Sequence, residues 1–185
     1  MIPNELAEFQ TSTGKTVLLR VLEEDDLTAL EWEGQYSHFR KLYRQHYKNS
    51  LAGSTLIWVV TDRTGKVIGQ VFIMLYAKDN EIADGKRRAY LFSFRIRDEW
   101  RGLGIGSFVM QYAEDYLREK GFSWLRLNVA KDNLKAIGIY LHRGYRIMGP
   151  DSGTWRYEDQ NNQWKTVCEP AWRMIKQLKE DSESV

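Results

Sequence analysis

Cysteine and histidine are scarce in this sequence of 185 residues, which contains one cysteine, Cys168, and three histidines. A single cysteine excludes a disulfide framework within the chain and a metal site built from several cysteines. The histidines, His38, His46 and His142, are scattered and show neither the HxH nor the HxxxH spacing of a metal site. We therefore predict that the protein binds no metal.

Long apolar runs and blocks of one charge are also missing. No apolar stretch approaches the ~20 residues that span a bilayer, and no apolar segment typical of a secretion signal is found near residue 1. These features predict a cytoplasmic protein without a membrane partner. The net charge is only +2, and the densest basic run, Lys86-Arg87-Arg88, is typical of a solvated loop. We therefore do not expect a nucleic-acid partner.

Length and composition are those of a folded globular chain. Hydrophobic residues make up 43% and charged residues 28% of the sequence, which suits one domain with a buried core. We expect this domain to span residues 1–178 and a polar tail to follow at 179–185. The aromatic content is high, at 13% with seven Trp and ten Tyr. It predicts an aromatic core, an aromatic-lined pocket, or a mixture of the two.

Hydrophobic periodicity predicts strands and helices that alternate along the chain. The expected strands lie at residues 16–22, 55–61, 66–76, 90–96, 124–130, 145–148 and 172–178. The expected helices begin at the acidic run 23–26, span 37–48 and 105–117, and begin again at Asn133. The strand at 124–130 follows a helix, so it should lie parallel to the strand at 90–96. Residues 150–169 are polar with interleaved aromatics and predict a hairpin excursion. The predicted fold class is α/β, a mixed sheet with helices on its faces.

Strict alternation along residues 90–96 would divide the side chains of this strand between the two faces of the sheet. One face would then carry Tyr90, Phe92, Phe94 and Ile96, and the other would carry Leu91, Ser93 and Arg95.

A glycine-rich loop lies between this strand and the clearest amphipathic helix. Its sequence is Arg101-Gly102-Leu103-Gly104-Ile105-Gly106, and such a loop brings main-chain N–H groups to an anion at a helix N-terminus. A nucleoside-triphosphate P-loop is excluded because Ser107, not lysine, follows the glycines. A dinucleotide fingerprint is excluded because no third glycine has the required spacing. The pattern that remains is Arg-x-x-Gly-x-Gly.

This loop resembles the acetyl-CoA pyrophosphate loop of the Gcn5-related N-acetyltransferases, the GNAT superfamily. A second motif after the next strand agrees with that family, with Tyr145 in place of its phenylalanine. The matching residues are Asn133, Ala136, Tyr140, Gly144 and Tyr145. The resemblance covers roughly residues 16–148 and implies a single N-acetyltransferase domain. It also implies a central mixed sheet, mostly antiparallel, in which a parallel pair of strands, 90–96 and 124–130, splays apart at a bulge. The implied reaction transfers an acetyl group from acetyl-CoA to a primary amine by direct attack in a ternary complex.

The resemblance also implies which residues bind acetyl-CoA. They are Arg95, Ile96, Arg97, Arg101, Gly102, Leu103, Gly104, Ile105, Gly106, Ser107, Asn133 and Tyr140. The loop would hold the pyrophosphate, and residues 95–97 would line the pantetheine arm. A main-chain N–H near Ile96 would polarise the thioester carbonyl. Asn133 would bond pantetheine as well as cap its helix.

Tyr140 is the candidate general acid. A tyrosine pKa of ~10 lies above that of a thiol at ~8.5, so the phenol stays protonated at neutral pH and can supply a proton to the departing thiolate. Periodicity alone favours a core tyrosine instead, because Tyr140 shares a face with Ala136 and Ile137. Only the motif that runs from Asn133 to Gly144 favours a catalytic role for Tyr140.

The general base and the acceptor remain open. The strand at 90–96 holds no carboxylate, so water must take the proton of the amine, or a carboxylate elsewhere must do so. The candidate carboxylates are Asp98, Glu99, Glu31 and Glu33. His46 is expected to be packed or exposed, not to act as a base. A non-catalytic acyl-CoA-binding regulatory module is the alternative function.

The acceptor pocket would take its walls from residues 31–47, 78–88 and 150–172. Three aromatic residues of the last segment, Trp155, Tyr157 and Trp164, are more typical of a sheet edge or a homodimer contact than of substrate contact. The identity of the amine is not encoded in any motif of the sequence.

Overall fold

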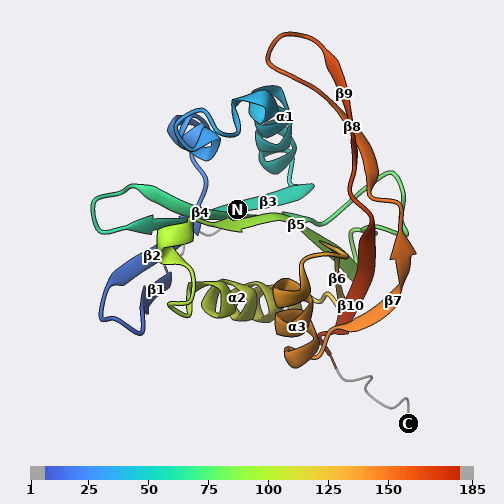
Figure 1. Ribbon diagram of the computed structural model, residues 1–185. Helices are drawn as coiled ribbons and strands as arrows, with labels where there is room; N and C mark the ends of the chain where they lie inside the picture. Colours follow the sequence, from blue (N-terminus) through green and yellow to red (C-terminus); the bar gives the residue numbers. More distant parts are fainter. Residues whose placement is uncertain (1–6, 180–185) are drawn as a thin grey trace.

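The computed structural model describes residues 7–179 and is organised around one eight-stranded sheet (Figure 1). In spatial order the strands are β1 (Ala7–Gln10), β2 (Thr16–Val21), β3 (Thr55–Asp62), β4 (Val67–Met74), β5 (Arg88–Ile96), β6 (Trp124–Ala130), β10 (Ala171–Gln177) and β7 (Arg146–Asp151). Neighbouring strands are antiparallel except for β5 and β6, which are parallel. The predicted fold class, a mixed and mostly antiparallel sheet with a parallel pair in its middle, is confirmed.

Helices cover both faces of the sheet (Figure 1). One face carries α2 (Ile105–Glu119) and α3 (Leu134–His142), and the other carries α1 (Arg40–Leu51). Each face has its own hydrophobic cluster, and the larger one lies under α2. A two-stranded ribbon, β8 (Thr154–Glu158) with β9 (Trp164–Cys168), extends beside α1 and corresponds to the predicted hairpin excursion. Within residues 7–179, no helix is both long and apolar enough to cross a membrane.

The amphipathic pattern of α2 is confirmed by burial. Ile105, Val109, Ala113 and Leu117 are at most 1% exposed and pack onto the sheet. The chain leaves α2 through Gly121, whose φ of 95° only glycine adopts without strain. It then enters β6 parallel to β5, as the sequence predicted.

Two expectations about the N-terminal part are corrected. The sequence predicted no strand before residue 16, but β1 pairs with β2 at the edge of the sheet. The helix expected after the acidic run is instead two 3₁₀ turns, Glu24–Leu27 and Ala29–Glu31. Trp32 and Glu33 follow with positive φ angles of 47° and 56°. An α-helix cannot continue through that backbone conformation.

The predicted division of β5 between two faces is wrong beyond Ser93. The pairing of β5 with β4 shifts register between Gln70 and Phe72, and Ser93 adopts a φ of 49°. This β-bulge adds one residue to β5 and therefore reverses the alternation of side chains after it. As a result, Phe92 packs on the α1 side of the sheet, whereas Phe94 and Ile96 pack on the α2 side.

Residues 180–185 of the predicted polar tail lie outside the described residues.

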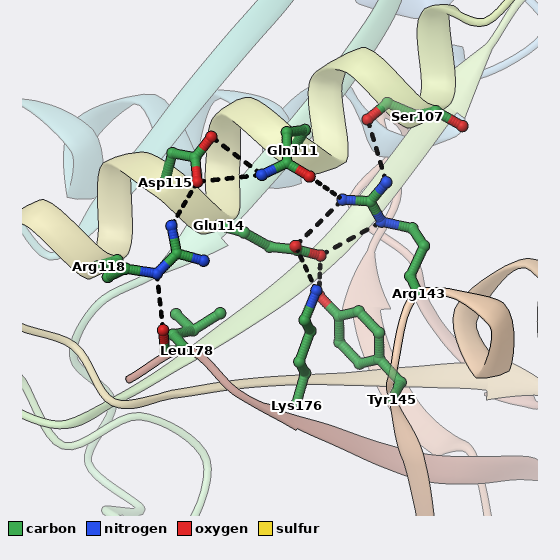
Figure 2. Close-up of polar contacts among 9 residues, drawn as sticks. All are labelled: Ser107, Gln111, Glu114, Asp115, Arg118, Arg143, Tyr145, Lys176 and Leu178. Carbon is green, nitrogen blue, oxygen red and sulfur yellow. Dashed lines mark hydrogen bonds and ion pairs between the residues drawn. The ribbon is translucent and has the colours of Figure 1, made fainter. Parts of the chain in front are cut away.

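A buried carboxylate joins α2 to the C-terminal part of the sheet (Figure 2). Glu114 of α2 is 0% exposed and accepts hydrogen bonds from Arg143 at 3.1 Å and Lys176 at 2.6 Å. The hydroxyl of Tyr145 donates to the same carboxylate at 3.2 Å. That hydroxyl is the group by which Tyr145 differs from the phenylalanine of the family motif. The cluster therefore fixes α2 against the segment after α3 and against β10, an arrangement with no signal in the sequence pattern.

Replacing Glu114 should destabilise the protein far more than replacing its neighbour. Glu114→Gln keeps the side-chain volume but leaves Arg143 and Lys176 without a negative partner, so we expect a loss of about 3 kcal/mol of unfolding free energy. Asp115→Asn removes a surface ion pair with Arg118 and weakens an exposed hydrogen bond from Gln111, so it should cost less than about 1 kcal/mol. Urea denaturation of both variants measures the difference. Equal losses would contradict a stabilising role for the buried cluster.

Candidate functional site

The parallel strands β5 and β6 separate in the middle of the sheet. They pair from Arg88 opposite Trp124 to Leu91 opposite Leu127, and no pairing follows, although both strands continue. Beyond that point β5 stays paired with β4 as far as Ile96, and β6 stays paired with β10 as far as Ala130. The two halves of the sheet therefore diverge there. We call this opening the split.

The bulge at Ser93 lies on the edge of the split. A positive φ in a residue other than glycine costs about 1–3 kcal/mol and clusters at functional sites. The Ser93 hydroxyl accepts a hydrogen bond of 2.9 Å from Gln70, which helps to hold the bulge. Beyond the bulge, the N–H of Arg97 donates to the carbonyl of Ile68 in β4 at 2.9 Å. Strand alternation then directs the main-chain groups of Ile96 away from β4, towards the split.

The glycine loop begins on the same side of the sheet as α2. Arg101 donates through Nε to the carbonyl of Ile96 at 2.9 Å and pairs with Asp98 at 2.8 Å, so it links the loop to the end of β5. Leu103 packs against the hydrophobic core. Gly102 and Gly104 have φ angles of 75° and 88°.

Helix α2 begins without a side-chain cap. Its N-cap is Gly104, whose carbonyl accepts the first helical hydrogen bond, from Phe108 at 3.0 Å. The N–H groups of Ile105, Gly106 and Ser107 therefore have no acceptor within the helix. Together with the helix dipole, these donors make the start of α2 suitable for an anion.

Asn133 and Tyr140 lie on α3, on the same face of the sheet as α2. The Asn133 side chain accepts from the N–H of Ala136 at 3.1 Å, which confirms its role as helix N-cap. Tyr140 packs edge-on against the ring of Tyr145, with 5.6 Å between centroids. Burial raises the pKa of Tyr140 to about 12. Its phenol is therefore a hydrogen-bond donor throughout the neutral range.

The side chains around Ile96 point away from the split. Arg95 reaches the α1 side, where it donates to the Tyr43 hydroxyl at 2.8 Å and lies 4.0 Å from the ring centroid of Tyr36. Arg97 pairs with Glu33 at 2.8 Å and donates to a carbonyl of β4. Ile96 itself is 8% exposed and belongs to the core. Main-chain groups are therefore what residues 95–97 can offer to a ligand in the split.

A cavity of about 570 Å³ lies on the other face of the sheet, between α1, the sheet and β8. Its lining residues are Phe39, Leu42, Tyr43, His46, Phe72, Ile82, Tyr90, Phe92, Ser93, Arg95, Asn128, Asp151, Gly153, Thr154, Trp155 and Glu169. All three segments that the sequence assigned to a pocket wall contribute. Ser93 and Asn128 lie on β5 and β6 just beyond the last paired residues, so the cavity reaches the split.

The aromatic residues of the ribbon divide between the cavity and the outside. Trp155 lines the cavity, with its ring 5.8 Å from that of Phe39. Tyr157 packs against Phe39 at 4.8 Å. Trp164 is 64% exposed on the outer strand of the ribbon.

None of the carboxylates suggested by the sequence as a base lines the cavity. Glu31 forms an ion pair with Arg40 at 2.6 Å, and Asp98 and Glu33 are paired with the arginines described above. The carboxylates that do line the cavity are Asp151 and Glu169. They were missed because they lie at strand ends that only the sheet order β6-β10-β7 brings near β5. Among residues 7–179, no group of three or more His, Cys, Asp or Glu side chains could hold a metal ion.

His46 is packed into the cavity wall, as expected. Its ring lies 5.6 Å from that of Phe72 and 5.0 Å from that of Phe92, and its Nδ1 is buried without a hydrogen-bond partner. Burial lowers the pKa of His46 to about 4. The imidazole is therefore neutral at pH 7 and is too weakly basic to deprotonate an alkylamine.

Comparison with known proteins places these features in a family. The model of the acetyltransferase (GNAT) family matches residues 20–145. An uncharacterized N-acetyltransferase, YdgE of Bacillus subtilis, is 25% identical over 145 residues, which cover 76% of this chain and 87% of that protein. The thialysine N-epsilon-acetyltransferase of Sus scrofa is 33% identical over 76 residues, which cover 40% of this chain and 45% of that protein.

Solved structures share the fold. The ribosomal-protein-S18-alanine N-acetyltransferase of Escherichia coli aligns with a TM-score of 0.66 at 19% identity, over 91% of this chain and 98% of that one. The spermidine/spermine N-acetyltransferase SpeG of Vibrio cholerae aligns with a TM-score of 0.65 at 23% identity, over 88% and 92% of the two chains.

The buried imidazole predicts a pH dependence of stability. The pKa of His46 is about 4 in the folded state and ~6.5 in the unfolded state, so the unfolded chain gains a proton first as the pH falls. The stabilisation from burying a neutral His46 is therefore fully present above pH ~6.5 and is lost as the pH falls towards 4. His46 should therefore lower the unfolding free energy by about 2 kcal/mol between pH 7 and pH 5.

Denaturant titrations of the wild type and His46→Leu at both pH values measure this. Between pH 7 and pH 5, the unfolding free energy of His46→Leu should fall by about 2 kcal/mol less than that of the wild type. A difference in unfolding free energy between the two proteins that stays constant with pH would show that His46 is not a buried neutral imidazole.

Proposed function

The chain belongs to the acetyltransferase (GNAT) family and is an N-acetyltransferase, and we propose that it transfers an acetyl group from acetyl-CoA to a primary amine by direct attack within a ternary complex. The family model spans residues 20–145, more than half of the chain. The acyl donor, the ternary complex and the roles of single residues are the parts that we add.

The split is the observation that carries this proposal. It opens between the face on which α2 begins without a side-chain cap and the face with the cavity. A pyrophosphate held by the N–H groups of residues 105–107 would lie at the entrance on one side. A peptide-like pantetheine arm in the split would bond the main-chain groups of β5 as an added strand does. The thioester would then reach the floor of the cavity beside Ser93.

The chain's own groups supply three functions in the transfer. The main-chain N–H of Ile96 stabilises the negative charge that develops on the carbonyl oxygen. As the C–N bond forms and the C–S bond breaks, Tyr140 donates a hydrogen bond to the departing sulfur. Its pKa of about 12 lies above the ~8.5 of a thiol, so it keeps its proton and solvent reprotonates the thiolate. The proton of the attacking amine leaves through water in the cavity.

The relatives support an amine as the acceptor. Their names give spermidine or spermine, thialysine and the alanine of ribosomal protein S18 as substrates of those proteins. A non-catalytic acyl-CoA-binding module remains the second candidate. It is favoured by one observation, the absence from the cavity of every carboxylate that the sequence suggested as a base.

A thiol-release assay with acetyl-CoA and a library of amines separates these functions, with mass spectrometry of the products. The proposal expects thiol release that depends on an amine and yields its N-acetyl derivative. Binding of acetyl-CoA without release for any amine would support the non-catalytic module. Absence of binding at millimolar acetyl-CoA would exclude both.

Two substitutions should each change a different kinetic constant. Gly106→Val places a side chain before the free N–H groups of α2 and should raise the KM for acetyl-CoA at least about tenfold, with kcat little changed. Tyr140→Phe removes the hydrogen bond to the leaving sulfur and should lower kcat about 100-fold, with the affinity for acetyl-CoA nearly unchanged. Steady-state kinetics and calorimetric titration with acetyl-CoA measure both constants.

The control for the first variant is a second helical glycine. A Cβ at Gly106 would meet only Phe94, at 3.9 Å, and one at Gly138 of α3 would meet nothing within 4 Å. Gly138→Val should therefore behave as the wild type. Gly104 is unsuitable, because its φ of 88° and a contact of 3.1 Å with Phe9 would strain any side chain. An unchanged KM in Gly106→Val would remove the loop from cofactor binding, and an unchanged kcat in Tyr140→Phe would show that Tyr140 does not stabilise the departing sulfur.

A further inference from the structure

Two carboxylates at one end of the cavity have no role in the proposed reaction. Asp151 accepts a hydrogen bond of 2.8 Å from the N–H of Gly153, and the carbonyl of Gly153 accepts one of 3.2 Å from the N–H of Glu169. Both residues are thereby held on either side of Gly153 and line the cavity. Within residues 7–179, neither carboxylate takes part in an ion pair. Their charges therefore remain available to a ligand.

Aromatic rings adjoin these carboxylates. Trp155 follows Gly153 by two residues, and both Trp155 and Tyr90 line the same cavity. Asp151 lies close enough to Tyr90 for its charge to add to burial in raising the pKa of Tyr90 to about 12. Arg126, which faces Tyr90 from β6, is directed to the main-chain oxygen of Glu81 and does not line the cavity. Carboxylates beside ring faces form the environment that binds organic ammonium groups.

At the other end of the cavity lies a cation, Arg95, that already has partners within the protein. Arg95 is held by the Tyr43 hydroxyl and by the ring of Tyr36, close to the split. A positive charge there disfavours the protonated form of an amine that enters the split. The two ends are separated across the sheet, because Asp151 pairs with Ala171 of β10 and Ala171 pairs with Ala130 of β6. Two strands therefore lie between Asp151 and β5, and neighbouring strands are about 4.8 Å apart. The wall between the two ends is apolar, formed by Phe39, Phe72 and Phe92 among others.

We propose that the acceptor is an elongated diamine whose one amine reacts at the split while its second, protonated amine binds between Asp151 and Glu169. The methylene chain between the two amines lies against the aromatic wall. The like charge of Arg95 helps to keep the reacting amine neutral, and this acts in place of a dedicated base. The inference rests on the proposed function, because it names the substrate class of the same site.

The test uses three probes of equal length, 1,7-diaminoheptane, heptylamine and 7-aminoheptanoate. With saturating acetyl-CoA, the wild type should use the diamine with a kcat/KM at least about tenfold above that for heptylamine. The double variant Asp151→Asn/Glu169→Gln should raise the KM of the diamine about tenfold and leave that of heptylamine within about twofold. Glu119→Gln removes one charge from the exposed end of α2, far from the cavity lining, and should match the wild type.

Calorimetric titration with 1,7-diaminoheptane, without acetyl-CoA, measures the same contact independently of the reaction. Binding that weakens about tenfold in the double variant supports the carboxylate site even if no acetyl transfer is found, which would then refute only the proposed function. Equal use of diamine and heptylamine, or an equal rise of both KM values in the double variant, would overturn the inference. Preference for 7-aminoheptanoate would overturn it as well, in favour of an anion held by Arg95.

Discussion

The bulge at Ser93 is the local constraint on which the site depends. One extra residue in β5 keeps the strand paired with β4 while it ends the pairing with β6 after Leu91. The same residue reverses the alternation of side chains, so that Arg95 reaches the cavity and Ile96 returns to the core. Without the bulge, an unbroken sheet would separate the loop on one face from the cavity on the other.

The two faces are stabilised by different kinds of contact. On the α2 side, the buried Glu114 holds α2, the segment after α3 and β10 together through Arg143, Tyr145 and Lys176. On the α1 side, aromatic rings packed in tilted and edge-on contacts around Phe39 and Phe72 form the cavity wall. A buried polar cluster thus supports the proposed cofactor face, and an apolar wall with polar ends supports the proposed acceptor face.

The sequence predicted those parts of the molecule whose signals are local. The loop from Arg101 to Gly106, the amphipathic helix after it and the cap at Asn133 each depend on neighbouring residues, and the structure has all three elements. The family resemblance implied a bulge in this strand, but its position at Ser93 could not be predicted, because a single residue with positive φ leaves no periodic signal. The faces of β5 were therefore assigned wrongly beyond it. Glu114 and the carboxylates of the cavity were missed for another reason, since their partners come from distant segments that only the strand order brings together.

A crystal structure of the complex with CoA tests the central claim most directly, namely that the split joins the two faces into one active site. The account predicts the pyrophosphate at the N–H groups of Ile105, Gly106 and Ser107, and pantetheine between β5 and β6 beyond Leu91 and Leu127. The sulfur should lie near Tyr140 on one side and Ser93 on the other. A CoA molecule bound outside the split, or strands that pair along their whole length in the complex, would contradict the account.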